Sequence, residues 1–108
     1  MEVIDCSDIR DSKVVGLTVS SDWVQKVHSI ELVLRIVGDQ EYRYTLSGVT
    51  RYSIYEDFGC EYISQVKLLY LESTVFLSLD PFDELSSAPD YENDCFWFEA
   101  SSLERTVI

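Results

Sequence analysis

Apolar residues recur at every second position through much of the chain, and this period predicts β-strands rather than helices. The pattern is clearest over residues 30–37 and 41–46, which flank a Gly38-Asp39-Gln40 turn. The two segments therefore predict a β-hairpin. Its apolar face is predicted to consist of Ile30, Leu32, Leu34, Ile36, Tyr42, Tyr44 and Leu46.

Strands are also expected on both sides of this hairpin. Before it, residues 14–20 place Val15, Leu17 and Val19 on one face. After it, further strands are predicted over residues 49–55, 62–71, 74–79, 95–100 and 103–108, with 62–71 and 74–79 forming a second hairpin.

Two segments fit more than one structure. Residues 22–27 suit either one helical turn capped by Asp22 or a bulged entry into the next strand. Residues 62–72 also fit a helical period through Ile63, Val66 and Tyr70, but the β-rich flanks and the lack of a good cap favour a strand.

These patterns predict an all-β fold, with room for one short helix. Six to eight strands would form a single antiparallel sheet, curled into a small sandwich or a partly open barrel. A length of 108 residues suits one domain, and only 4 Gly and 2 Pro leave no flexible linker to divide it. We therefore expect residues 1–108 to form a single domain.

The charge balance changes which partners are expected. The chain has 20 acidic and 8 basic side chains, a net charge of −12, which argues against direct binding to nucleic acid or to an anionic membrane. A hydrophobic fraction of 46% excludes a disordered acidic tail. No apolar stretch approaches the roughly 18 to 20 residues that cross a membrane, and no secretory signal is present, so we expect a cytoplasmic protein.

The residue types that usually carry catalysis are sparse. His28 is the only histidine, and no nucleophile-elbow or nucleotide-binding motif occurs. Three cysteines, Cys6, Cys60 and Cys95, lack the paired spacing of a disulfide framework or a zinc site, so reduced thiols are expected. We expect no enzyme activity, no metal centre and no cofactor.

The carboxylates concentrate in the last part of the chain. From Leu68 onward there are nine acidic residues and one basic residue, and most of these acids lie in a long polar segment over residues 80–94. Loops of this length are commonly functional. The predicted binding residues of this segment and of the strand that follows it are Asp80, Asp83, Glu84, Asp90, Tyr91, Glu92, Asp94 and Trp97.

Several roles fit this acidic loop. Asp90-x-Glu92-x-Asp94 imitates the start of a calcium loop, but Cys95 replaces the required Gly and Ser101 the closing Glu, which excludes an EF-hand and leaves only an improvised oxygen site. A glycosidase carboxylate pair would need a cleft that so small a domain rarely builds. The remaining interpretations are recognition of a basic protein and a solvated loop that keeps the protein soluble.

Trp97 has two readings. Alternation sends Phe96 and Phe98 to one face and Trp97 to the other, where the indole is either exposed as a binding anchor or covered by the long loop.

The segments Phe76-Leu77-Ser78-Leu79-Asp80-Pro81-Phe82-Asp83-Glu84 and Asp94-Cys95-Phe96-Trp97-Phe98-Glu99-Ala100, with Leu46-Ser47-Gly48-Val49 before them, carry a resemblance. They resemble small bacterial β-domain proteins, some of which are similar to the immunity proteins paired with polymorphic toxins. The resemblance covers about residues 27–100 and implies a class of protein but no catalytic residue.

Together these features predict a non-catalytic, immunity-type inhibitor that blocks a toxin or nuclease-like partner with a basic surface. The alternatives are a phage-type inhibitor that mimics nucleic acid, and a ligand- or calcium-binding β-barrel that uses Trp97 as a stacking platform. Edge strands of such a sheet can also pair between copies, which allows a homodimer.

Overall fold

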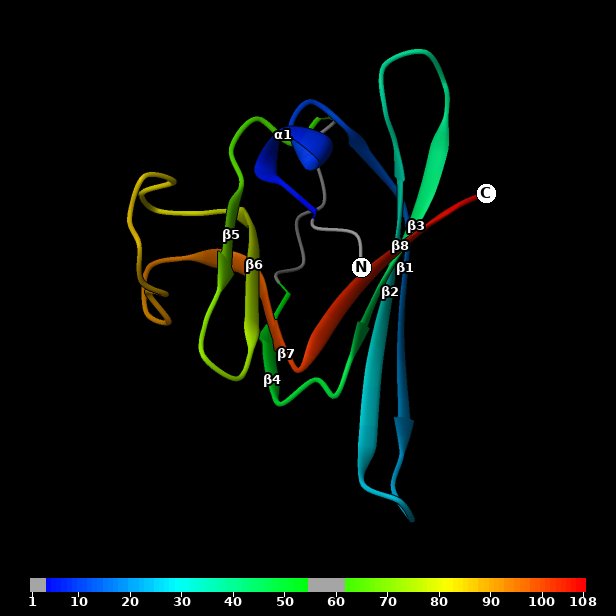
Figure 1. Ribbon diagram of the computed structural model, residues 1–108, viewed down its shortest axis with the longest axis vertical. Coiled ribbons are helices and arrows are strands. Elements are labelled where there is room, and N and C mark those ends of the chain that lie inside the picture. Colours follow the sequence, from blue (N-terminus) through cyan, green and yellow to red (C-terminus); the bar gives the residue numbers. More distant parts are fainter. Residues whose placement is uncertain (1–3, 55–61) are drawn as a thin grey trace.

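The computed structural model describes residues 4–54 and 62–108, and in these ranges one short helix and eight strands form two layers (Figure 1). The first sheet has the strand order β1-β2-β3-β8 and the second β4-β7-β6-β5, with antiparallel pairing throughout. The predicted all-β fold is confirmed. Its elements are α1 (Cys6–Ile9), β1 (Lys13–Asp22), β2 (Val27–Arg35), β3 (Glu41–Ser47), β4 (Arg51–Ser53), β5 (Lys67–Tyr70), β6 (Val75–Asp80), β7 (Cys95–Ala100) and β8 (Ser102–Val107).

The β2–β3 hairpin confirms the clearest sequence prediction. Leu32 pairs with Tyr44 in register, and both side chains are fully buried. The chain reverses through Gly38 and Asp39, whose φ angles of 96° and 68° lie in the left-handed region that these two residue types tolerate. Ile36, at the end of the predicted apolar face, is only half-buried.

The β5–β6 hairpin is also confirmed, so the ambiguous segment 62–72 contains a strand and not a helix. In contrast, β4 is limited to Arg51–Ser53, shorter than the predicted 49–55, whose last residue lies outside the described residues. The short helix α1 follows a capping box at Asp5 and Asp8: Asp5 Oδ1 accepts a hydrogen bond from the Ser7 amide (3.1 Å) and Asp8 Oδ2 from the Asp5 amide (2.9 Å).

The predicted face of β1 is wrong at Val15, where a β-bulge interrupts the alternation, whereas Leu17 and Val19 lie opposite the buried Leu32 and Ile30 as expected. Val14 pairs with Leu34 and Gly16 with Val33, so Val15 is an extra residue without a partner. The side chains that pack against the core are consequently Val14 and Leu17, whereas Val15 is exposed. Residues 23–26 of the ambiguous segment 22–27 form a turn between β1 and β2, and Asp22 Oδ1 accepts hydrogen bonds from the amides of residues 24 and 25 (3.0 Å each).

The two sheets face each other across one hydrophobic core. Leu32 and Leu34 from the first sheet and Leu77 and Phe98 from the second are fully buried in the same cluster. Ile9 brings the short helix onto this core. Burial of apolar side chains from both layers is therefore what holds the sheets together.

The chain passes between the sheets twice at a single corner. β3 leads into β4 beside the point where β7 leads into β8, and the Ser101 amide donates to the carbonyls of Ser47 (2.9 Å) and Gly48 (3.1 Å). Gly48 has a φ of 65°, and a Cβ atom there would lie 2.5 Å from Ser101 Oγ. A side chain at position 48 would therefore collide with the side chain of Ser101, and the positive φ also favours glycine there.

The crowding at this corner predicts that alanine substitutions at two glycines with positive φ reduce stability by different amounts. Gly38→Ala is expected to destabilise the protein by about 1 kcal/mol through backbone strain alone, since nothing lies within 4 Å of its Cβ position. Gly48→Ala should lose about 1–2 kcal/mol more because the new methyl group also collides with Ser101. Urea denaturation measures both, and Ser101→Gly should recover the additional loss. Equal losses at the two glycines would contradict the crowding at this corner.

Candidate functional site

The acidic segment after β6 is folded back over the outer face of the second sheet. Strands β6 and β7 are buried on both faces: Leu77 and Phe98 point into the core, whereas Phe76 and Trp97 point to the other side and are also buried. We call residues 81–94 the acidic loop. Because it covers the second apolar surface, this loop is part of the folded structure.

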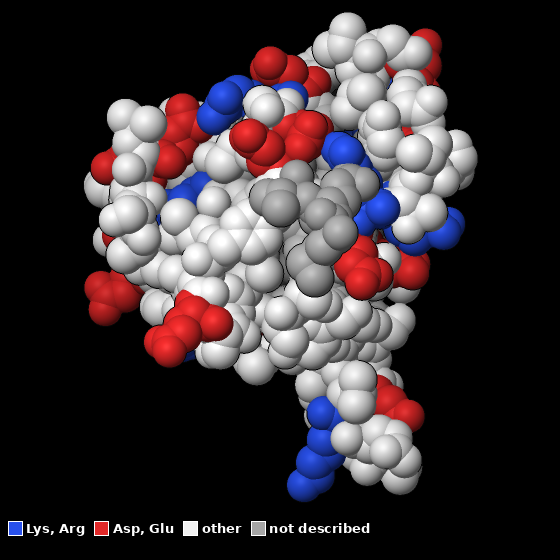
Figure 2. Space-filling model, in the orientation of Figure 1, with Lys and Arg blue, Asp and Glu red and all other residues white. Residues whose placement is uncertain are grey.

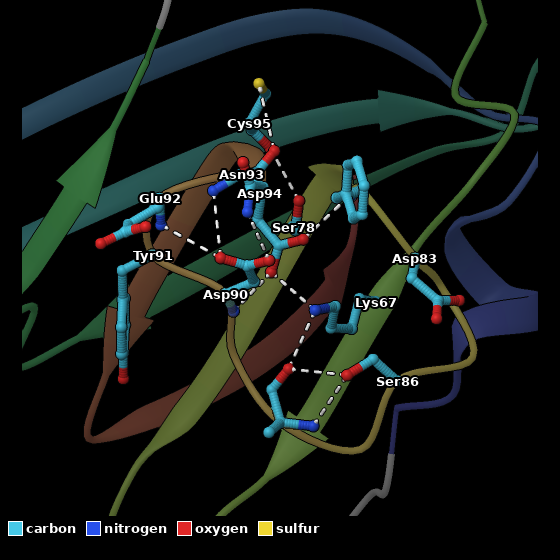
Figure 3. A network of polar contacts seen from close by, with 12 residues as sticks. Lys67, Ser78, Asp83, Ser86, Asp90, Tyr91, Glu92, Asn93, Asp94 and Cys95 are labelled. Atoms are coloured by element: carbon cyan, nitrogen blue, oxygen red, sulfur yellow. Dashed lines mark hydrogen bonds and ion pairs between the residues drawn. The ribbon is translucent and has the colours of Figure 1, made fainter.

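A buried ion pair fastens the acidic loop to the sheet (Figure 3). Lys67 Nζ on β5 lies 2.7 Å from Asp94 Oδ2, and the two side chains are 1% and 0% exposed. The ammonium group also donates to the Ala88 carbonyl (2.9 Å). The Asp94 carboxylate accepts from the amides of Phe82 (Oδ1, 2.9 Å) and Asp90 (Oδ2, 2.9 Å). One pair of side chains therefore holds the start, the middle and the end of the loop.

An aromatic cluster forms the underside of the loop. Trp97 stacks on Phe76 with ring centroids 5.5 Å apart, and Tyr91 from the loop packs edge-on against Trp97 at 5.2 Å. The Tyr91 hydroxyl donates to the buried Glu99 carboxylate, whose other oxygen lies 3.2 Å from Arg51 Nε. The hydrogen bond to Glu99 is the main reason why the pKa of Tyr91 is raised, with desolvation adding to it.

Asp90 organises the last turn of the loop. Asp90 Oδ1 accepts hydrogen bonds from the amides of Glu92 (3.3 Å) and Asn93 (3.1 Å), and Oδ2 accepts from Asn93 Nδ2 (3.0 Å). These donors stabilise the charged carboxylate, so the pKa of Asp90 is lowered, with the Asn93 side chain as the largest cause.

Among the exposed side chains of the acidic loop are two large apolar and two acidic ones that we call the loop surface: Phe82, Asp83, Leu85 and Glu92. Phe82 is 74% exposed and Leu85 is 89% exposed, which is unusual for large apolar side chains in a loop whose backbone is held by an ion pair and hydrogen bonds. Glu84 beside them is half-buried and paired with Arg10 (3.1 Å). The loop surface therefore consists of two exposed apolar side chains with carboxylates beside them.

The predicted binding residues divide into three groups. Asp80, Asp83 and Glu92 are exposed, and Tyr91 is partly so, with its ring against Trp97. Glu84 and Asp90 are half-buried and occupied by internal contacts. The remaining two, Asp94 and Trp97, are buried beneath the loop and lie away from the surface on which they were predicted to bind a partner.

Sequence reasoning missed the residues that give the loop its shape. Lys67 stands alone as a charge in Val66-Lys67-Leu68-Leu69, and a lone lysine in an apolar run signals a buried ion pair. Glu99 and Arg51 carried no such signal, because they lie 48 positions apart in the sequence. Phe82 and Leu85 were not among the predicted binding residues.

Little in the described chain suggests other chemistry. In residues 4–54 and 62–108, no three His, Cys, Asp or Glu side chains gather where a metal ion could bind. Both oxygens of Asp94 already accept from Lys67 or backbone amides. Cys6 and Cys95 are free thiols, and Cys60 lies outside the described residues. Within the described part, no helix is long and apolar enough to cross a membrane.

Comparison with known proteins adds no relative. No protein-family model, no curated protein and no solved structure matches the chain.

Because the Lys67–Asp94 pair is buried, replacing Lys67 by methionine should reduce stability far more than replacing a basic residue of an exposed pair. Lys67→Met leaves Asp94 charged and buried, so the free energy of unfolding should fall by about 3–5 kcal/mol. Arg35→Met removes the exposed pair with Glu41, whose side chains are 44% and 30% exposed, and should change stability by no more than about 1 kcal/mol. Urea denaturation followed by tryptophan fluorescence measures both. Similar losses in the two variants would contradict an anchoring role for Lys67.

The turn at Asp90 predicts a titration shift. Asn93→Ala removes the strongest donor to the carboxylate, so the pKa of Asp90 should rise toward its ordinary value of 3.8. Because the folded pKa is depressed, the stability that Asp90 contributes is present above pH 3.8 and is lost as the pH falls through the folded pKa. NMR titration of the Asp90 carboxyl carbon measures the shift, with Gln40→Ala as a remote amide control. An unchanged titration in Asn93→Ala would refute this hydrogen bond.

Proposed function

We propose that the protein is a non-catalytic binding domain that docks its acidic loop on a basic surface of another protein, as an immunity-type inhibitor does. The observation that carries the proposal is the pre-formed loop: a buried ion pair and an aromatic cluster fix its backbone while Phe82 and Leu85 stay exposed. A loop that is already ordered loses less entropy on binding.

The exposed apolar residues supply a physical reason for tight association. Burying Phe82 and Leu85 against a partner removes apolar surface from water, and aromatic side chains are common binding anchors. In a loop kept only for solubility, exposed positions would instead be polar. The apolar anchors therefore favour recognition over the solubility interpretation.

Internal ion pairs leave the surface with an excess of negative charge. Among the described residues, five basic side chains are neutralised by acids of the same chain: Arg10, Arg35, Arg51, Lys67 and Arg105. On the face seen in Figure 2, most basic groups accordingly lie beside acidic ones. The remaining carboxylates would steer a basic partner toward this domain and raise the association rate at low salt.

The test separates charge from apolar anchoring. The immobilised protein captures its partner from a host lysate, and the purified partner is then titrated against variants. Asp83→Asn with Glu92→Gln should lower the association rate by about tenfold at low salt and flatten its salt dependence. Phe82→Ala with Leu85→Ala should raise the dissociation rate by about 30-fold.

Matched controls come from the β2–β3 turn, which carries an exposed apolar residue and an exposed acid. Val37→Ala and Asp39→Asn should leave both rate constants unchanged. The partner's activity should fall in proportion to the added protein until the two are equimolar. If the loop-surface variants bind as the controls do, or if the bound partner stays active, the proposal fails.

A further inference from the structure

The β1–β2 hairpin extends beyond the rest of the molecule. Figure 1 shows its turn end projecting past both sheets, and we call this projection the arm. Trp23 at the turn is 78% exposed, and its ring packs edge-on against His28 with centroids 5.3 Å apart. His28 Nδ1 lies 2.9 Å from Ser21 Oγ. The arm is therefore an ordered extension and carries an exposed apolar end.

Strand β1 forms the outer edge of the first sheet along this arm. It pairs only with β2 among the described strands, so the backbone amides and carbonyls on its other side lack a strand partner. Natural edge strands are usually short or charged, which prevents them from pairing with other chains. β1 is neither: it spans 10 residues, and Val14 to Ser21 carry no charge.

The other three edge strands are short or charged, as natural edge strands usually are. The edge strand β8 carries Glu104 and Arg105 at its centre. β4 has 3 residues and β5 has 4, too few for an extended ladder. An uncharged edge of this length stands out in a chain with a net charge of −12.

The charges at the two ends of β1 match an antiparallel copy of the same strand. Lys13 begins the strand and Asp22 ends it. Because Val15 is bulged out, nine positions of β1 take part in strand pairing, and Thr18 is the central one. Rotation about a two-fold axis at Thr18 places Lys13 of one copy beside Asp22 of the other, at both ends. The same register sets Leu17 beside Val19, which is 42% exposed.

We propose that two copies of the chain associate through antiparallel pairing of their β1 strands about a two-fold axis at Thr18. The contact joins the two first sheets into one eight-stranded sheet. It supplies backbone partners to both edges, covers Val19 and pairs the terminal charges. Val14 to Ser21 carry no charge, so the central parts of the paired strands meet without like charges, and the arm is largely white where it leaves the body in Figure 2.

Salt dependence distinguishes this contact from binding through the acidic loop. Two molecules that each carry a net charge of −12 repel one another, and salt screens that repulsion. Dimerisation through β1 should therefore strengthen as salt is added. Docking of the acidic loop on a basic protein should weaken under the same change.

Sedimentation velocity across a concentration series tests the proposal on the full chain. The protein should show a monomer–dimer equilibrium whose dissociation constant falls with added salt. Thr18→Lys sets two lysines side by side at the axis and should raise the dissociation constant at least about tenfold. The matched control is Thr106→Lys on the opposite edge of the same sheet, which should leave it unchanged.

A second variant tests the register. Lys13→Asp places like charges at both ends of the paired strands and should also weaken the dimer, most strongly at low salt. Thermal melting of each variant checks that the monomer stays folded. A protein that is monomeric at every concentration and salt level would overturn the proposal. So would a dimer that tolerates Thr18→Lys, or one that responds equally to Thr106→Lys.

Discussion

The ion pair between Lys67 and Asp94 is the contact on which the second half of the chain depends. The acidic loop has no regular secondary structure of its own, so its backbone needs other hydrogen-bond partners. The Asp94 carboxylate and the Lys67 ammonium provide them at Phe82, Ala88 and Asp90. Burial strengthens these bonds and makes the loss of either charge expensive, so one arrangement of the loop is strongly preferred.

This arrangement links the net charge of the chain to its fold. Each basic side chain that is held in an internal pair leaves the remaining acids without a neighbouring cation. The same loop that hides Asp94 and Trp97 turns Phe82 and Leu85 toward solvent. The buried carboxylate of Asp94 and the exposed apolar side chains of the loop surface are therefore two consequences of the same anchoring.

The sequence predicted what depends on local periodicity and missed what depends on long-range pairing. The β2–β3 hairpin was predictable because Leu32 and Tyr44 lie on a regular alternation around a Gly-Asp turn. The face of β1 was only partly predictable, since a bulge at Val15 breaks the alternation and brings Val14 instead of Val15 against the core. Asp94 was assigned to the surface by its composition, because its partner Lys67 is 27 positions away and no local pattern joins them.

The two proposed contact surfaces lie on different sheets and are expected to respond oppositely to ionic strength. The acidic loop covers the outer face of the second sheet, whereas β1 is an edge of the first, so pairing through β1 leaves the loop of each copy free. A dimer would then carry two loops, and a partner with two basic sites could bind both at once. If both proposals hold, low salt would favour single domains steered by charge, and higher salt would favour paired ones. Ionic strength would thus set whether recognition depends on the rate of encounter or on the number of loops engaged.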